Sequence, residues 1–295
     1  MVDDVTMRLR QALPGLRPAE RRIAELTLAS PAEAAEMTIT TLAERCATSP
    51  ASVTRLYRTL GFTGYPAFRI ALARAAADEQ GRRLSFGVED ADIAPDDDAR
   101  DVARKLAYHE ARAIEETAAA LDVVELDRVV DAIVQASVID IYGSGSSSLA
   151  GQDLQQKLRR IGYQANCWID SHLGITSAAV LRPGTVAIGF SHSGRTSETL
   201  AALRTAAAAG AHTVAVTNFP DGPLAQSADS VLTTASRETR FRSGAMASRM
   251  AQLTVVDILF LRVAQRAPEA VTVSLTATYD AIATRHERGS GTKPT

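Results

Sequence analysis

The sequence predicts two regions of different fold class: an all-α N-terminal region, then an α/β region built on a doubly wound parallel sheet. Residues up to about 77 read as short helices with little β-propensity, whereas residues after 121 alternate short apolar runs with helical stretches. Strands that alternate with helices are typical of a parallel sheet covered on both faces. A length of 295 residues also suits two domains better than one.

Within the second region, the order of the elements predicts βαβ units and a parallel sheet. The expected strands are Val138–Tyr142, Tyr163–Ile169, Thr185–Phe190, His212–Thr217 and Ser230–Thr234. The expected helices are Gln152–Ile161, Ser171–Leu181, Thr196–Ala209 and a closing helix near Ala245–Ala264. A leading helix is expected from Asp101 to about Leu121.

Changes in composition and in apolar pattern along the chain predict the domain boundaries. We expect a helix-turn-helix domain over 1–78, an acidic linker over 79–100, the α/β domain with its leading and closing helices over 101–270, and a C-terminal helix with a disordered tail over 271–295. Gly, Pro and crowded Asp in GRRLSFGVEDADIAPDDDAR, residues 81–100, favour an extended, mobile connection.

Composition indicates an ordinary cytoplasmic protein. The formal net charge of -2 does not indicate a nucleic-acid partner, although DNA contact needs only a local basic patch. Cys46 and Cys167 lie far apart without metal-ligand spacing, so we expect buried free thiols, no metal and no cofactor. The N-terminus lacks the apolar stretch of a signal peptide, and no apolar run approaches the roughly 20 residues of a membrane helix.

Residues 38–60, TITTLAERCATSPASVTRLYRTL, have the pattern of two short helices separated by a turn. Thr38 is expected to cap the first helix and Ser49 the second, with Pro50 in its first turn. An apolar stripe in the second helix must pack inward and consists of Val53, Leu56, Tyr57 and Leu60. Small polar and arginine side chains make the rest of that helix a candidate DNA reader, with candidate contacts at Ser49, Ser52, Thr54, Arg55 and Arg58.

Two observations leave the interpretation of this helix pair as a DNA reader undecided. The turn has Ala47 or Thr48 where a helix-turn-helix often has Gly, and a left-handed conformation there would cost roughly 1 kcal/mol. An ordinary amphipathic helix pair with a solvated polar face would show the same spacing.

Three pieces around these helices occur in the order and spacing of a known family. They are PAERRIA, the Ser-Pro start of the second helix, and LGFTGYPAFR just after it. By these pieces, residues 16–73 closely resemble the N-terminal domain of the RpiR family of sugar-responsive regulators. The resemblance implies a helix-turn-helix domain whose partner is a double-stranded DNA operator.

Two loops of small hydroxyl residues follow strands in the α/β region. The first is GSGSSS, residues 143–148, and the second is SHSGRT, residues 191–196. Backbone N–H groups at a helix N-terminus bind phosphate without a lysine, and hydroxyls add donors that rotate to fit. Both loops should lie at the carboxyl ends of parallel strands, where ligands bind.

Other interpretations fit the first loop by itself. It can be a tight strand-to-helix turn. It can also be a dinucleotide site, with Asp170 near the place of a ribose-binding acid, although the third Gly of that motif is missing and the second loop would have no purpose.

The pattern S-x-S-G-x-T after an apolar strand is more specific. Together with GSGSSS it makes residues 125–265 resemble the SIS (sugar isomerase) domain, a doubly wound fold that binds phosphosugars. The resemblance implies that Ser191, Ser193 and Thr196 hold the phosphate, and that Gly145, Ser146 and Ser147 contact the phosphate end or the sugar. Ser248 and Arg249, before the last helix, are further candidates at the rim.

No acid–base pair for sugar isomerisation is evident in the sequence, so we expect no catalytic residue. The candidate groups are His172, His192, Glu198, His109 and Glu110. A metabolic isomerase has no evident use for a DNA-reading domain. The expected function is a transcription regulator that is controlled by a phosphosugar and assembles as a homodimer or homotetramer. The alternatives are a sugar-phosphate isomerase with a helical extension, and a DNA-binding protein whose SIS domain only dimerises.

Overall fold

The computed structural model describes residues 5–236 and 245–289. The chain divides into two compact units between Ala111 and Arg112, within the long helix α7 (Ala99–Ala120). None of the helices in these residues is long and apolar enough to cross a membrane. Cys46 and Cys167 are both free, and burial raises the pKa of Cys167 to about 11.

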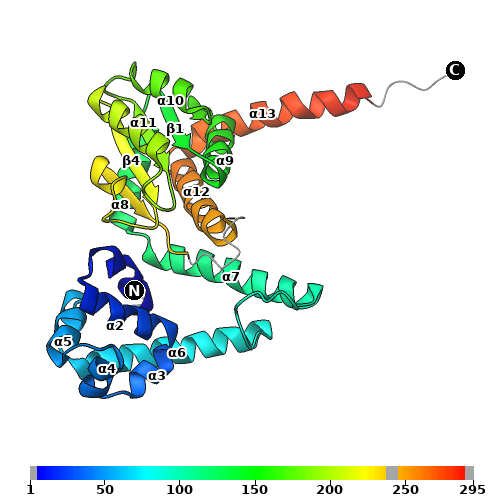
Figure 1. Cartoon of the computed structure of the whole chain (residues 1–295). Coiled ribbons are helices and arrows are strands. Elements are labelled where there is room, and N and C mark those ends of the chain that lie inside the picture. The colour runs from blue at the N-terminus through cyan, green and yellow to red at the C-terminus, as the bar shows by residue number, and fades with distance from the viewer. Residues whose placement is uncertain (1–4, 237–244, 290–295) are drawn as a thin grey trace. The chain divides into compact units, whose positions relative to one another are not determined.

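The first six helices of the first unit pack around one apolar core (Figure 1). The helices are α1 (Val5–Ala12), α2 (Pro18–Ala29), α3 (Pro31–Glu36), α4 (Ile39–Arg45), α5 (Pro50–Thr59) and α6 (Tyr65–Phe86), with a 3-10 turn at Leu13–Gly15. The predicted stripe of Val53, Leu56, Tyr57 and Leu60 is buried in that core, together with Ile23 of α2. The apolar pattern therefore predicted the inward face of α5 correctly.

The expectation of an extended linker over 81–100 is wrong for residues 81–86, which are helical, whereas residues 87–98 contain neither helix nor strand. Helix α6 continues to Phe86 and ends at Gly87, which takes the left-handed conformation with φ 64°. Val88 and Ala91 then pack around the fully buried ring of Tyr108 on α7. Local acidity suggested repulsion, but Lys105 Nζ lies 2.7 Å from Asp97 Oδ1, and this hydrogen bond lowers the pKa of Asp97.

The second unit contains a parallel five-stranded sheet in the order β2-β1-β3-β4-β5. The strands are β1 (Ile139–Gly143), β2 (Ala165–Trp168), β3 (Val186–Phe190), β4 (His212–Thr217) and β5 (Ser230–Thr233). Each lies within one residue of a predicted strand, except that β2 begins two residues later. Ile139 pairs with Ala165 on one side and with Val186 on the other, which fixes the register around β1.

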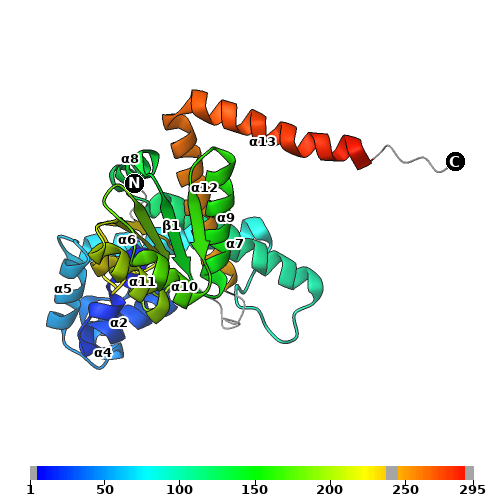
Figure 2. The ribbon, with the colours of Figure 1, turned by 90° about the horizontal axis from the view of Figure 1, so that it is seen from above.

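Helices cover both faces of this sheet (Figure 2). One face packs against α8 (Val123–Gln135), α9 (Ser146–Arg160) and α12 (Met246–Arg266), whereas the other packs against α10 (Ser171–Ala178) and α11 (Ser197–Ala208). Side chains alternate between the faces, so Ile139 and Ile141 join the first core while Tyr142 joins the second. The predicted α/β doubly wound architecture is confirmed.

The chain continues after α12 into α13 (Pro268–Gly289). The helix expected in residues 271–295 is therefore present as far as Gly289. The disordered tail expected at the end of the chain lies, from residue 290 on, outside the described residues.

Candidate functional site

The two hydroxyl-rich loops follow the central pair of strands in the sheet. Strands β1 and β3 are neighbours, and the chain leaves β1 toward β2 on one side and β3 toward β4 on the other. Gly143 at the end of β1 is paired with Phe190 at the end of β3, so both loops start at the same edge. This topological switch point, at the carboxyl ends of the strands, is where doubly wound folds bind ligands.

The first loop is a tight turn into helix α9. A Cβ on Gly143 would lie 2.9 Å from the Ser147 carbonyl oxygen, so only glycine allows the helix to start this close to β1. Gly145 has φ 57°, and the Ser148 hydroxyl donates to its carbonyl over 2.7 Å. The predicted residues Ser146 and Ser147 form the first turn of α9 at this edge.

One turn into α9, a glycine that the sequence analysis missed sets the packing on the sheet. A Cβ on Gly151 would lie 3.0 Å from Ile141 and 3.1 Å from the Cys167 sulfur. Close helix-to-sheet packing therefore comes from Gly151 rather than from the third glycine of a dinucleotide motif. The dinucleotide interpretation loses support because the residue at that motif position is Ser148.

The second loop is held by its own backbone and by the strand beside it. The Oγ of Ser191, which is 1% exposed, lies 2.9 Å from Thr196 Oγ1. The Asn218 backbone N–H, after β4, donates to the His192 carbonyl over 3.1 Å. Ser193 is half-buried, and its Oγ accepts from the Arg195 N–H at 3.2 Å. Thr196 occupies the N-cap of α11. The loop thus presents hydroxyls at a helix N-terminus, as a phosphate site requires.

Helix α12 brings a third group of polar side chains to the first loop. Gln252 Nε2 donates to Ser147 Oγ over 3.0 Å, although the two residues are 105 apart in the chain. Gln252 is 1% exposed, and Ser248, one turn earlier on the same helix face, is 4% exposed. Ser248 was predicted from the sequence and Gln252 was not; the i, i+4 spacing of two polar residues in an apolar helix was the available signal.

A small cavity opens beside the first loop, between the ends of β1 and β2. Its lining residues are Tyr142, Gly143, Ser144, Trp168, Ile169, Asp170, Ser171, Gly174, Glu198, Thr199 and Ala202. Two of them carry buried polar atoms that have no hydrogen-bond partner among the described residues, Trp168 Nε1 and Thr199 Oγ1. Because such atoms cost free energy when unpaired, and the cavity has a volume of about 10 Å³, their presence here favours an ordered water.

The two acidic residues that line this cavity, Asp170 and Glu198, lie at helix N-termini. Asp170 accepts from the Leu173 N–H at 2.9 Å and caps α10. Hydrogen bonds from its own backbone N–H and from the Ser197 hydroxyl lower the pKa of Glu198. A general base for isomerisation works best with a pKa near the operating pH, so a Glu198 with a lowered pKa fits that task poorly.

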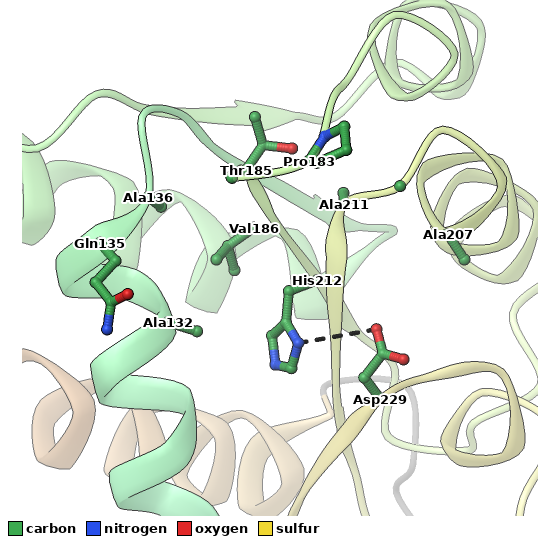
Figure 3. A pocket seen from close by; sticks show the side chains of 12 residues that line it. Ala132, Gln135, Ala136, Pro183, Thr185, Val186, Ala207, Ala211, His212 and Asp229 are labelled. Atoms are coloured by element: carbon green, nitrogen blue, oxygen red, sulfur yellow. Dashed lines mark ion pairs between the residues drawn. The ribbon is translucent and has the colours of Figure 1, made fainter.

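A larger cavity of about 590 Å³ lies at the opposite edge of the sheet, at the amino ends of β3 and β4 (Figure 3). His212 and Asp229 line it, with their side chains 3.9 Å apart. Asp229, directly before β5, also accepts from the N–H and the hydroxyl of Thr213 on β4, at 2.9 and 2.8 Å. None of the predicted site residues lines this cavity. Within the described parts of the chain, no three His, Cys, Asp or Glu residues are arranged to hold a metal ion.

In the first unit, α4 and α5 form the predicted helix pair. The Thr38 hydroxyl accepts from the Thr41 N–H at 3.1 Å, as expected for a cap. The expectation for Ser49 is wrong: it stands at the N-cap of α5, but its Oγ lies 3.3 Å from Ser52 Oγ and caps no backbone N–H. Ala47 does take a left-handed conformation, with φ 47°, and Arg22 from α2 donates to its carbonyl over 3.0 Å.

The five predicted DNA contacts differ in how exposed their side chains are. Ser49, Arg55 and Arg58 are exposed, and Thr54 is partly exposed with its hydroxyl donated to the Pro50 carbonyl at 3.0 Å. Ser52 is only 3% exposed, so its placement on the open face of α5 was wrong. The apolar stripe is wide enough to draw it inward, and its hydroxyl accepts from Arg55 Nη2 at 2.9 Å.

The left-handed Ala47 yields a stability prediction. Ala47→Gly is expected to stabilise the first unit by about 0.5–1 kcal/mol, because relief of about 1–2 kcal/mol of strain exceeds the added entropy of the unfolded chain. Ala73→Gly, at an exposed position inside α6, is the matched control and should destabilise by about 1 kcal/mol. Urea unfolding of both variants measures whether the free energy of unfolding rises or falls relative to the wild type. Equal destabilisation by both would show that the turn carries no strain.

Comparisons with known proteins agree with this geometry. Residues 4–79 match the model of the helix-turn-helix domain of the rpiR family, and residues 132–262 match that of the SIS domain. The chain is 40% identical, over 89% of its length and 91% of the relative's, to an uncharacterized HTH-type transcriptional regulator of Caldanaerobacter subterraneus subsp. tengcongensis. The chain belongs to the RpiR family of HTH-type transcriptional regulators.

Solved structures extend the likeness of this RpiR-family regulator to both regions. The Vibrio vulnificus NanR protein complexed with ManNAc-6P is 30% identical and superposes with a TM-score of 0.60, over 94% of this chain and 97% of NanR. The sugar isomerase domain of an RpiR transcription factor from Sphaerobacter thermophilus is 26% identical, with a TM-score of 0.56, over 61% of this chain and 98% of that domain. The names of the curated relatives place the chain among regulators rather than among sugar-phosphate isomerases.

Proposed function

We propose that this regulator binds a DNA operator through the open face of α5, and that a phosphorylated sugar at the carboxyl edge of the sheet modulates this binding. The observation that carries the proposal is the pair of hydroxyl-lined loops after β1 and β3, which share the switch point of the fold. The NanR structure, which holds ManNAc-6P, supports the same ligand class.

The phosphate is assigned to the second loop. The Ser193 and Thr196 hydroxyls and the backbone N–H groups at the start of α11 would surround it, with the positive end of the helix dipole behind them. Ser191 has a supporting role, since it is buried and contacts Thr196. Gly145, Ser146, Ser147 and Ser248 would contact the rest of the sugar from the other side.

The cavity beside Trp168 has a volume of about 10 Å³, enough for about one water molecule, which would link the sugar to buried polar groups. The buried Trp168 indole N–H and the Thr199 hydroxyl would each form a hydrogen bond with that water. Carboxylates such as Asp170 accept from hydroxyl groups. The edge of the sheet thus offers donors for a phosphate and acceptors for a polyol.

Control of DNA binding requires that the sugar phosphate bind one arrangement of the protein better than another. Helix-turn-helix dimers place their recognition helices about 34–36 Å apart on a near-palindromic site. We propose a homodimer or homotetramer, with residues 1–78 as the DNA reader and 101–270 as the sensor, in which the ligand changes this spacing.

The proposal is tested with the full chain and duplexes from its own genomic neighbourhood. Fluorescence anisotropy should detect binding of the protein to one of these duplexes. ManNAc-6P or another phosphosugar of a panel should change the affinity of the protein for that duplex. The effective sugar should also raise the melting temperature, by an amount equivalent to about 2.7 kcal/mol at 100 times its Kd. Binding of no duplex, or the same affinity with every sugar, would refute the corresponding half of the proposal.

A further inference from the structure

The side chain of Arg55 is held on two sides within the first unit. Its Nε donates to Glu20 Oε1 of α2 over 3.1 Å, and its Nη2 donates to Ser52 Oγ, one turn earlier on α5, over 2.9 Å. The Arg55 side chain is nevertheless 50% exposed, whereas that of Glu20 is 8% exposed. One edge of the guanidinium is thus anchored in the protein, and half of the side chain faces solvent.

The partner of Arg55, Glu20, is a buried carboxylate. Glu20 lies in the first turn of α2, where the helix dipole favours a carboxylate. A carboxylate removed from water is costly unless a charge and hydrogen bonds compensate it. Arg55 supplies that compensation from 35 residues away, so the position of Glu20 and the orientation of Arg55 depend on each other.

The anchored guanidinium keeps donors for a further ligand. Arginine has five N–H donors in a planar fork, and these two contacts engage one on Nε and one on Nη2. One hydrogen of Nη1 and the second hydrogen of Nη2 remain side by side at the end of the fork, and the other Nη1 hydrogen points to the opposite edge. Guanine offers two acceptors, O6 and N7, at matching spacing in the major groove.

We propose that Glu20 is a positioning residue that holds the Arg55 guanidinium, with Ser52, for an end-on bidentate contact with a guanine in the operator. This inference rests on the proposed function, because it takes α5 to be the helix that enters the major groove. Arg58, three residues later on α5, is exposed with no side-chain partner recorded among the described residues and suits a phosphate contact instead.

Fixing Arg55 before binding has a measurable consequence. A free arginine loses rotamer freedom when it meets a base, and the loss for one immobilised side chain corresponds to up to about tenfold in affinity. A side chain already held by Glu20 avoids that loss only for a base that fits the fixed fork. Glu20 should therefore act on the preference for guanine at one position and leave phosphate contacts unchanged.

The test is selection from a randomised duplex library with the full-length protein, its Glu20→Gln variant and a matched control. The control is Glu33→Gln, which removes another inter-helix pair in the same unit, Glu33 with Arg45. We expect the wild-type motif to contain a G·C pair in each half-site whose preference falls about tenfold in Glu20→Gln. The other positions and the dependence of affinity on salt should stay as in the wild type, and Glu33→Gln should keep the wild-type motif.

Further variants separate positioning from a merely structural role. Adding Glu20→Gln to Arg55→Ala should cause no additional loss of base preference, because Glu20 acts through Arg55. Thermal unfolding identifies any variant that fails to fold, and Glu20→Asp then serves in place of Glu20→Gln. A Glu20→Gln motif identical to the wild type, or a weakening that is equal for all sequences, overturns the inference. Failure of the wild type to enrich any sequence overturns the proposed DNA binding itself.

Discussion

Loss of the Ser193 and Thr196 hydroxyls together should weaken phosphosugar binding by more than about 100-fold. Each hydroxyl is proposed to donate a hydrogen bond to the charged phosphate, and one such bond contributes about 1.5–3 kcal/mol. Ser193→Ala with Thr196→Val removes both hydroxyls, while the backbone hydrogen bond from Asn218 to the His192 carbonyl, which anchors the loop to the segment after β4, does not involve them. Titration calorimetry with the sugar phosphate that stabilises the wild type measures the loss.

Thr205→Val is the matched control for this double variant. Thr205 lies on the same helix, α11, and its hydroxyl donates to the Ala201 carbonyl within the helix at 2.9 Å. The control should keep wild-type affinity, and the double variant should keep basal operator binding while the response to the sugar disappears. Wild-type affinity in the double variant would place the phosphate elsewhere.

Arg55→Ala should reduce operator affinity by about 5- to 150-fold, because a bidentate base contact contributes about 1–3 kcal/mol. The same change leaves the buried Glu20 carboxylate without its charged partner. Arg58→Ala should differ in kind: it should weaken binding to all sequences and lower the slope of log affinity against log salt by about 1. Anisotropy titrations at several salt concentrations distinguish the two.

Arg74→Ala controls for the loss of one positive charge. Arg74 is exposed on α6, outside the helix pair formed by α4 and α5. Its replacement should change operator affinity little at moderate salt, because exposed charges are screened beyond about 10 Å at 0.1 M salt. An unchanged affinity in Arg55→Ala, or equal effects of all three replacements, would mean that α5 does not read the bases. Phosphosugar affinity should be the same in all three variants.

Sequence patterns alone determined the architecture of this protein. Period-two and period-3.6 apolar patterns are local, and they predicted all five strands and the inward face of α5. The hydroxyl loops after β1 and β3 were equally visible, because the chemistry of a strand-to-helix turn lies in consecutive residues. The sequence limited the left-handed turn residue to Ala47 or Thr48, and the structure places it at Ala47.

Only the tertiary structure decided which side chains meet across elements. Glu20 meets Arg55 and Gln252 meets Ser147 because helices distant in the chain pack side by side, and no local pattern encodes such pairs. The acidic segment after α6 folds against α7 for the same reason: Lys105 and Tyr108 provide partners that a local count of Asp residues does not include. Periodicity specifies which face of an element is buried, but the packing of whole elements determines what that face contacts.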